Sequence, residues 1–352
     1  MKQDSRTAMV AGVDLGDRRS VYVLLDGKAE VVGQGRLRTC DHALRETFGR
    51  LAPLRVAIEA GTHSPWVSRH LEELGHEVVV ANPRQVPLIT RHLPKSDETD
   101  AETLARLALV DRRLLRPISH RSQTSQEHLV LLRARAAAVT TRTQLINTLR
   151  GLVKPFGQRL PSCDADRFAD QVREHLPEAL APALLPLLET VAQLSESIRG
   201  YDTEVARLSR ESYPETERLR QVQGVGPITA LTFLLTLETP ERFARSRQAG
   251  AYLGLVPRRS QSGEQDPELA ISRAGDEEVR RLLLQCAHYI LGAHAQASDL
   301  RRWGLGLAER RGKKKAVVAV ARKLAVLLHR LWRTGEDYEP LRHSPEASAM
   351  TS

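Results

Sequence analysis

The first hundred residues alternate short apolar runs with turn signals and helical spacing, and this alternation constrains the fold more than any other feature. The predicted strands are 9–15, 20–25, 30–33, 55–60 and 77–81, and the predicted helices are 66–74 and 97–110. Asp26-Gly27 is a strong hairpin signal, and Asn82-Pro83 ends the last strand. Strands that give way to helices in this order predict an α/β domain over residues 8–120.

From residue 121 the pattern changes to helix, with breaks at Pro155, Pro161 and Pro177. One stretch repeats apolar residues at alternating steps of three and four. Its positions are Leu184, Leu187, Val191, Leu194, Ile198, Tyr201, Val205 and Leu208. This 3.5-residue repeat is typical of a coiled coil and predicts self-association through the helix. The alternative is an amphipathic helix that packs on its own domain.

A third, mostly helical region follows, interrupted at Gly224-Val225-Gly226-Pro227 and by a loop over 257–269. The first interruption resembles a helix-hairpin-helix turn, whose backbone N–H groups face a phosphate, although a turn that merely joins two helices explains it equally well. A chain of 352 residues exceeds what one core usually organises. The predicted regions are 8–120, 121–212, 213–335 and a disordered tail over 336–352.

The net charge of +9 and the pI of about 9.8 favour a polyanionic partner, and nucleic acid is the commonest one. Eleven basic residues and one acid lie between Arg301 and Arg333, with Lys313, Lys314 and Lys315 at the centre. A basic protein without such a partner is the alternative. Arg322 and Lys323 interrupt the longest apolar stretch, so no membrane span is expected. Three widely spaced cysteines exclude a disulfide framework and fit a reducing cytoplasm.

Four acids occupy the places where an α/β sheet gathers catalytic groups. Asp14 and Glu59 end predicted strands, and Asp97 and Asp100 begin a predicted helix. Strand ends meet at one edge, and residues three apart share a helix face, so all four can approach one another. Two Mg²⁺ ions held there could align a phosphodiester and activate the attacking group. Each acid has a structural alternative; Asp97, for instance, could be the helix N-cap.

Several motifs resemble the Asp-Glu-Asp-Asp (DEDD) transposases of insertion sequences, the insertion-sequence one-hundred-and-ten family. They are Gly12-Val13-Asp14-Leu15-Gly16, Ile58-Glu59-Ala60-Gly61-Thr62, Asn82-Pro83 and Lys95-Ser96-Asp97-Glu98-Thr99-Asp100-Ala101. Ser96 replaces the threonine of the family's pattern. The resemblance implies a ribonuclease-H-like, RuvC-type domain with a mixed sheet. It also implies that Asp14, Glu59, Asp97 and Asp100 are catalytic ligands of Mg²⁺, with two ions per site and Mn²⁺ as a possible substitute.

The C-terminal region resembles the second domain of the same family. The matching segments are Gly224-Val225-Gly226, Phe243, Gln248, Tyr252-Leu253-Gly254-Leu255-Val256-Pro257-Arg258-Arg259, Ser262-Gly263, Ile271-Ser272-Arg273-Ala274-Gly275 and Arg280. Asp276 departs from the asparagine that is commoner there. The resemblance implies that Ser262 is the catalytic nucleophile, although a Ser-Gly pair is usually just a turn and Ser260 is its nearest rival. Arg258 and Arg259 could hold the scissile phosphate.

The resemblance further implies the reaction and its partners. The serine hydroxyl would attack a DNA phosphate and form a covalent protein–DNA bond, which conserves the phosphodiester for rejoining. A structured guide RNA would select donor and target DNA, and the protein would act as a homo-oligomer, a dimer or tetramer. The basic residues from 301 to 333 suit RNA and DNA backbones equally. With 4% aromatic residues, extensive base stacking is less expected than backbone and shape recognition.

Three other functions were compared with serine recombination. A RuvC-like junction resolvase or nuclease would use the same acids to activate water and would form no covalent adduct. A sugar kinase or related ATPase also begins with Asp-Leu-Gly after a strand, but it needs further glycine-rich phosphate and adenosine loops that this sequence lacks. A DNA-binding relic with an inactive site is disfavoured because the four acids and the serine are all present.

Overall fold

The computed structural model describes residues 9–84, 86, 96–258 and 269–342. The chain divides into two units, residues 1–121 and 122–352. Residues 343–352 of the predicted tail and the stretch that carries Ser262 and Arg259 fall outside the described residues.

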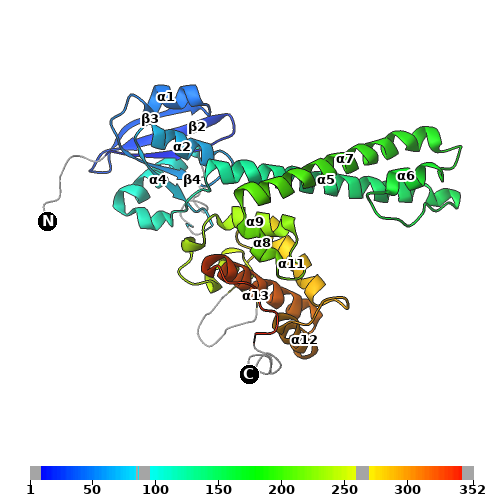
Figure 1. The fold of residues 1–352 in the computed structure, drawn as a ribbon. Helices are drawn as coiled ribbons and strands as arrows, with labels where there is room; N and C mark the ends of the chain where they lie inside the picture. Colours follow the sequence, from blue (N-terminus) through cyan, green and yellow to red (C-terminus); the bar gives the residue numbers. More distant parts are fainter. Residues whose placement is uncertain (1–8, 85, 87–95, 259–268, 343–352) are drawn as a thin grey trace. The chain divides into compact units, whose positions relative to one another are not determined.

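A five-stranded sheet with the order β3-β2-β1-β4-β5 forms the first unit (Figure 1). Its elements are β1 (Val10–Asp14), β2 (Arg19–Leu25), β3 (Val31–Arg38), α1 (Asp41–Phe48), β4 (Arg55–Glu59), α2 (Ser64–Glu73), β5 (Glu77–Ala81), α4 (Asp97–Val110) and a short 3-10 helix, η1 (Arg112–Leu115). The first three strands are antiparallel, while β4 pairs in parallel with both β1 and β5. The sheet is therefore mixed, and all five predicted strands are confirmed. The helices α1 and η1 were not predicted.

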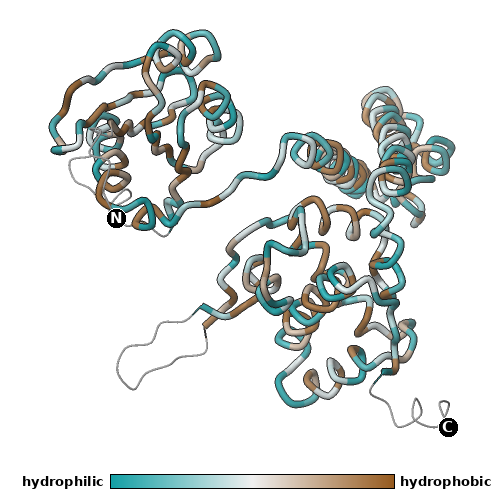
Figure 2. Tube along the Cα trace, turned by 60° about the vertical axis from the view of Figure 1, so that its left-hand side comes forward, coloured by the Kyte–Doolittle hydropathy of each residue, from teal (hydrophilic) through white to brown (hydrophobic). Residues whose placement is uncertain are grey.

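Apolar side chains cover both faces of this sheet because successive strand residues point to opposite sides. On one face Val10 and Val23 pack with Leu104 and neighbouring residues of α4. On the other face the strands pack with α1 and α2, through residues that include Phe48 and Leu71. In Figure 2 brown stretches alternate with white and teal ones along the trace of this unit. Asp14 and Glu59, the two candidate catalytic residues on strands, lie at the ends of β1 and β4, next to the residues that form the two cores.

The second unit is helical, with no strand among its described residues. Its helices are α5 (Gln123–Leu152), η2 (Lys154–Phe156), α6 (Phe168–Arg173), α7 (Ala181–Ser212), α8 (Glu215–Arg220), α9 (Pro227–Leu237), η3 (Pro240–Arg242), α10 (Arg247–Tyr252), α11 (Glu277–Ile290), α12 (Asp299–Arg311) and α13 (Lys313–Thr334). The change from α/β to helix near residue 121 is confirmed.

The apolar repeat of α7 packs on α5 of the same chain, and the two helices run side by side (Figure 1). Leu188 and Val191 contact a cluster that contains Leu149, and Val205 and Leu208 lie in a second cluster with further α5 residues. Polar contacts reinforce the pair, since Arg135 donates from Nε to Asp202 at 2.6 Å. The described structure therefore has the alternative arrangement, an amphipathic helix that packs on its own chain, and this stripe is not left for a partner.

The remaining helices of the second unit, α8 to α13, share one core. Phe233 of α9, Leu283 of α11 and Leu324 of α13 are fully buried in it. Helices of this unit carry alternating brown and teal bands in Figure 2, the pattern of helices with one buried face. Among the described residues, no helix is long and apolar enough to cross a membrane.

Candidate active site

The parallel pairing of β1 with β4 brings Asp14 and Glu59 to the same edge of the sheet. Val13 pairs with Ile58 in the register, and each acid is the next and last residue of its strand. Both strands point the same way, so the two carboxylates leave the sheet at adjacent carboxyl ends. This is the edge where open α/β sheets place their ligands.

Close packing of α4 on β1 brings the other two acids to this region. A Cβ atom at Gly12 would lie 1.9 Å from the carbonyl oxygen of Ala101 and 2.6 Å from the backbone nitrogen of Ala105. Only glycine permits that approach. Because Asp100 immediately precedes Ala101, the first turn of α4 lies beside the end of β1. Asp100 is 6% exposed, whereas Asp97 at the start of the helix is exposed.

Ser96, not Asp97, caps α4. Its hydroxyl accepts a hydrogen bond from the backbone N–H of Thr99 at 3.1 Å. The alternative role of Asp97 as the N-cap is therefore wrong, because Asp97 is already the first helical residue. Its carboxylate is not needed to cap the helix, although negative charge in a first turn interacts favourably with the helix dipole.

A fifth acid in the same turn, Glu98, is held elsewhere. Arg36 of β3 donates from Nε to the Glu98 carboxylate at 3.1 Å and pairs with it through a second guanidinium nitrogen. The bond to Arg36 lowers the pKa of Glu98 below its usual value. Glu98 is thereby separated from Asp97 and Asp100, which flank it in sequence.

The four acids thus come from one strand edge and one helix start, and carboxylates are the donor class that Mg²⁺ and Mn²⁺ prefer. Their chemistry fits a divalent cation. Among the residues that the structure describes, however, no three His, Cys, Asp or Glu side chains are grouped closely enough to hold one.

A histidine that the sequence did not single out links two loops at this edge. His63, in the loop after β4, contacts Asp17 in the loop after β1, with 3.2 Å between Nε2 and Oδ1. Trp66 donates its indole N–H to Nδ1 of His63 at 3.1 Å, which leaves the proton on Nε2 to be donated to Asp17. The position of His63 four residues after Glu59 was the only sequence signal for it.

In the second unit, glycines and a buried arginine form the base of the loop that was predicted to carry the nucleophile. Gly254 has φ +69°, and a Cβ there would lie 2.3 Å from the Ala274 carbonyl oxygen. Arg280 is 8% exposed and donates to the carbonyl oxygens of Leu253 and Ala274 at 3.2 and 2.8 Å. These residues of the family pattern therefore hold the backbone on the two sides of the loop together.

Two further residues complete this base. Arg258, which was predicted to contact phosphate, is exposed, and its N–H bonds the Ala270 carbonyl oxygen at 3.0 Å. Asp276 caps α11 by accepting from the N–H groups of Glu278 and Val279 at 3.1 and 3.2 Å. An aspartate here starts the helix as asparagine would. Ser262 and Arg259 lie outside the described residues.

The three predicted nucleic-acid-binding lysines, Lys313, Lys314 and Lys315, are exposed in the first turn of α13. Positive charge at a helix N-terminus opposes the helix dipole. The three lysines therefore do not stabilise the helix, and binding to an anionic partner would explain why they occur at this position.

Comparisons with known proteins identify two separate matching regions in this chain. A family model described as "Transposase" (DEDD, IS110) matches residues 11–156, and one described as "Transposase IS116/IS110/IS902 family" matches residues 216–301. A "Probable family 20 transposase" of Pseudomonas aeruginosa is 31% identical over 338 residues, covering 94% of this chain and 98% of that protein. The chain belongs to the IS116/IS110/IS902 family of transposases.

Two other relatives of this transposase are named for their insertion sequences. The "Transposase for insertion sequence element IS1111A" of Coxiella burnetii is 29% identical, with 96% of this chain and 93% of that protein covered. The transposase for IS1328 of Yersinia enterocolitica is 30% identical, with 80% and 87% covered. DEDD transposase domains depend on divalent metal in general. Membership of this family of DNA-acting enzymes makes the sugar-kinase alternative wrong.

Within the transposase, the two matched regions contain different sets of predicted residues. The first model covers Asp14, Glu59, Asp97 and Asp100, and the second covers the stretch with Ser262. The lysines at 313–315 lie beyond both.

Proposed function

We propose that this transposase cuts and rejoins DNA through a serine–DNA intermediate, with Asp14, Glu59, Asp97 and Asp100 as ligands of two Mg²⁺ ions and Ser262 as the nucleophile. Mn²⁺ would be an acceptable substitute. The observation that carries the proposal is the meeting of the β1 and β4 ends with the first turn of α4 at one edge of the sheet. This edge supplies oxygen ligands from three separate segments.

When bound, the metal ions would polarise the scissile phosphate and stabilise the charge that develops on its oxygens. The protein's own residues do the positioning. Gly12 sets the depth at which α4 sits on β1, and Ser96 starts α4 so that Asp97 and Asp100 fall in its first turn. Arg36 keeps Glu98 out of the ligand set.

In the covalent step, Oγ of Ser262 attacks phosphorus and gives up its proton, while the bond from phosphorus to one deoxyribose oxygen breaks and that oxygen takes a proton. The products are a phosphoserine bond and a free DNA hydroxyl. A hydroxyl of another strand then attacks the phosphoserine and releases Ser262, so no external energy source is required. Arg258 and Arg259 would hold the phosphate during both steps.

Exchange between DNA molecules needs more than one copy of this machinery, and we propose a dimer or tetramer. The acids and Ser262 belong to different units, which would meet at the DNA within one chain or across protomers. Since α5 covers the apolar stripe of α7, association would use other surfaces of these helices. We also propose the functional division 8–120, 121–212 and 213–335, cytoplasmic action and a structured guide RNA. Lys313, Lys314 and Lys315 would contact a nucleic-acid backbone, either DNA or RNA.

The test is denaturing electrophoresis of the protein with labelled element-end DNA, the RNA encoded beside it, and Mg²⁺. A covalent adduct is expected for the wild type and for Ser260→Ala, the matched control, and no adduct for Ser262→Ala. Cleavage without an adduct in any variant would overturn the serine mechanism. It would favour the alternative, a RuvC-like nuclease that activates water at the same acids.

A further inference from the structure

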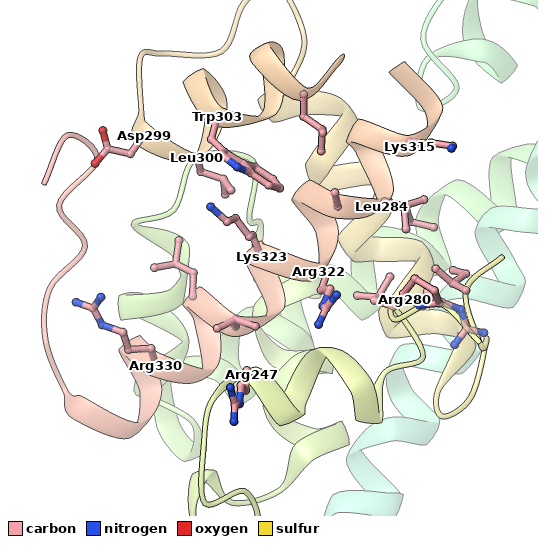
Figure 3. A pocket seen from close by; sticks show the side chains of 18 of the residues that line it. Arg247, Arg280, Leu284, Asp299, Leu300, Trp303, Lys315, Arg322, Lys323 and Arg330 are labelled. Atoms are coloured by element: carbon pink, nitrogen blue, oxygen red, sulfur yellow. The ribbon is translucent and has the colours of Figure 1, made fainter. Parts of the chain in front are cut away.

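A large groove lies among the C-terminal helices of the second unit, and the proposed function uses only Lys314 and Lys315 of its lining. It encloses about 1470 Å³, and its lining comes from α10, α11, α12, α13 and the segments 255–257, 269–273 and 337–342 (Figure 3). Pockets for small molecules typically hold roughly 300–1,000 Å³. The groove therefore has room for a ligand longer than one nucleotide.

Along α13 the groove alternates cationic and apolar side chains. Lys315, Val318, Arg322, Val326 and Arg330 all line it and follow one another at steps of three or four residues. This spacing puts them on one helix face. At 1.5 Å per residue the stripe is about 22 Å long. A linear ligand with repeating negative charge would match such a stripe.

Six of the groove's cations form no ion pair with any described residue: Arg247, Arg273, Arg280, Lys314, Arg322 and Lys323. The other end of the groove differs, because Arg330 is paired with Glu336 at 2.7 Å. Cations without a carboxylate partner that line one hollow repel one another and attract anions. The charge of this wall is thus complementary to phosphate groups.

A tryptophan lies beside these charges. The ammonium of Lys323 stands 3.9 Å from the centre of the Trp303 ring, and the two side chains point toward one another in Figure 3. Leu300 and Leu307, three and four residues away on α12, line the same wall. Partial burial here lowers the pKa of Lys323. A flat aromatic ring with apolar neighbours next to phosphate-binding cations is the arrangement that binds an unstacked base.

We propose that this groove binds a short segment of single-stranded DNA, with phosphates on Lys314, Arg247 and Arg322 and one unpaired base on the Trp303 ring. The Lys323 ammonium leaves the ring for a phosphate when the base arrives. The choice of DNA over RNA rests on the proposed function. Pro257 and Leu269, which lie before and after the stretch that contains Ser262 in the sequence, both line the groove.

Tryptophan fluorescence provides the test, because the chain has three tryptophans and two can be replaced. The protein is Trp66→Phe/Trp332→Phe with Ser262→Ala, and the probe is a short oligothymidylate without Mg²⁺. Binding should quench Trp303. Lys314→Glu or Arg322→Glu should weaken binding at least tenfold, while Arg310→Glu, an exposed cation of α12 outside the groove, should change it less than twofold. Neither metal nor the serine takes part, so failure here is separate from failure of the recombination chemistry.

Each other outcome overturns a stated part of the proposal. Equal losses for Arg310→Glu and Lys314→Glu would mean diffuse charge attraction rather than a groove. Binding without quenching would remove Trp303 as the base platform. Tighter binding of oligouridylate would assign the groove to RNA, and equal binding of a duplex would exclude the unpaired base. If the fluorescence of Trp303 fell as the protein concentration was raised in the absence of DNA, a second copy of the chain would be the occupant of the groove.

Discussion

Gly12 of β1 lies so close to Ala101 of α4 that a Cβ atom at position 12 would stand 1.9 Å from the Ala101 carbonyl oxygen. This contact sets the distance between the strand that ends in Asp14 and the helix that begins with Asp97 and Asp100. A backbone contact, rather than a bond between acids, therefore positions the candidate metal ligands.

Gly12→Ala should destabilise the first unit by about 3 kcal/mol, the upper part of the range for overpacking, because backbone atoms cannot yield as a flexible side chain can. Hydrogen exchange of β1 and α4 measures it. Gly61→Ala is the matched control, since a Cβ there meets nothing within 4 Å. If the two variants exchanged alike, the close packing of α4 on β1 would be wrong.

Asp97→Asn should abolish Mg²⁺-dependent cleavage, with a loss of about 100-fold or more, whereas Glu98→Gln should retain most of it. The reason is that Arg36 already binds Glu98, while Asp97 is a proposed ligand. Calorimetric titration with Mg²⁺ in the presence of DNA would follow binding directly. Equal loss in both variants would contradict the proposed ligand set.

Arg280→Met should destabilise the second unit by about 1–3 kcal/mol, because two carbonyl oxygens would lose a buried charged donor. The adduct yield should fall as well, since Arg280 holds the base of the loop. Arg281→Met is the neighbouring control. Arg281 only pairs with Glu278 one turn away, and such a pair contributes about 0.3–0.5 kcal/mol. Thermal unfolding of both variants measures the difference. An equal decrease of the melting temperature in the two variants would contradict the structural role of Arg280.

Lowering the pH should decrease the stability of the second unit, because protonation of His329 favours the unfolded chain. This side chain is fully buried, its Nε2 donates to the Pro240 carbonyl oxygen at 3.0 Å, and burial lowers its pKa below the ordinary value of 6.5. The unfolded chain therefore takes up a proton at a higher pH than the folded chain does. The stability that depends on neutral His329 is complete above pH 6.5 and is lost as pH falls through the lowered pKa.

Urea unfolding at roughly pH 7 and pH 5 measures this loss of stability. These two values lie on either side of the pKa of an ordinary histidine. His329→Gln, which keeps an amide donor but cannot titrate, should give a flatter dependence on pH than the wild type. His288→Gln, on the exposed side of α11, is the control. A wild-type slope in His329→Gln would assign the acid sensitivity to other groups.

Local patterns were sufficient for most elements of the fold. The helix at 97–110 and the strand at 77–81 have the predicted bounds, because an acidic, capped start and the Asn82-Pro83 stop are signals within the element itself. The helix α1 was missed because its N-cap, Cys40, makes no side-chain hydrogen bond that would mark its start. The alternative role of Asp97 as the N-cap of α4 was wrong because its neighbour Ser96 is also a good cap and occupies that position.

The sequence by itself determined the order of strands and helices, the identity of the four acids and the family, since these depend on residues near one another along the chain. Tertiary structure decided the rest. The pairing of β1 with β4, the contact of Gly12 with Ala101 and the covering of α7 by α5 join residues far apart in sequence. Periodicity specifies which face of an element is buried, but not which partner covers it, and the partner depends on how all the elements pack together.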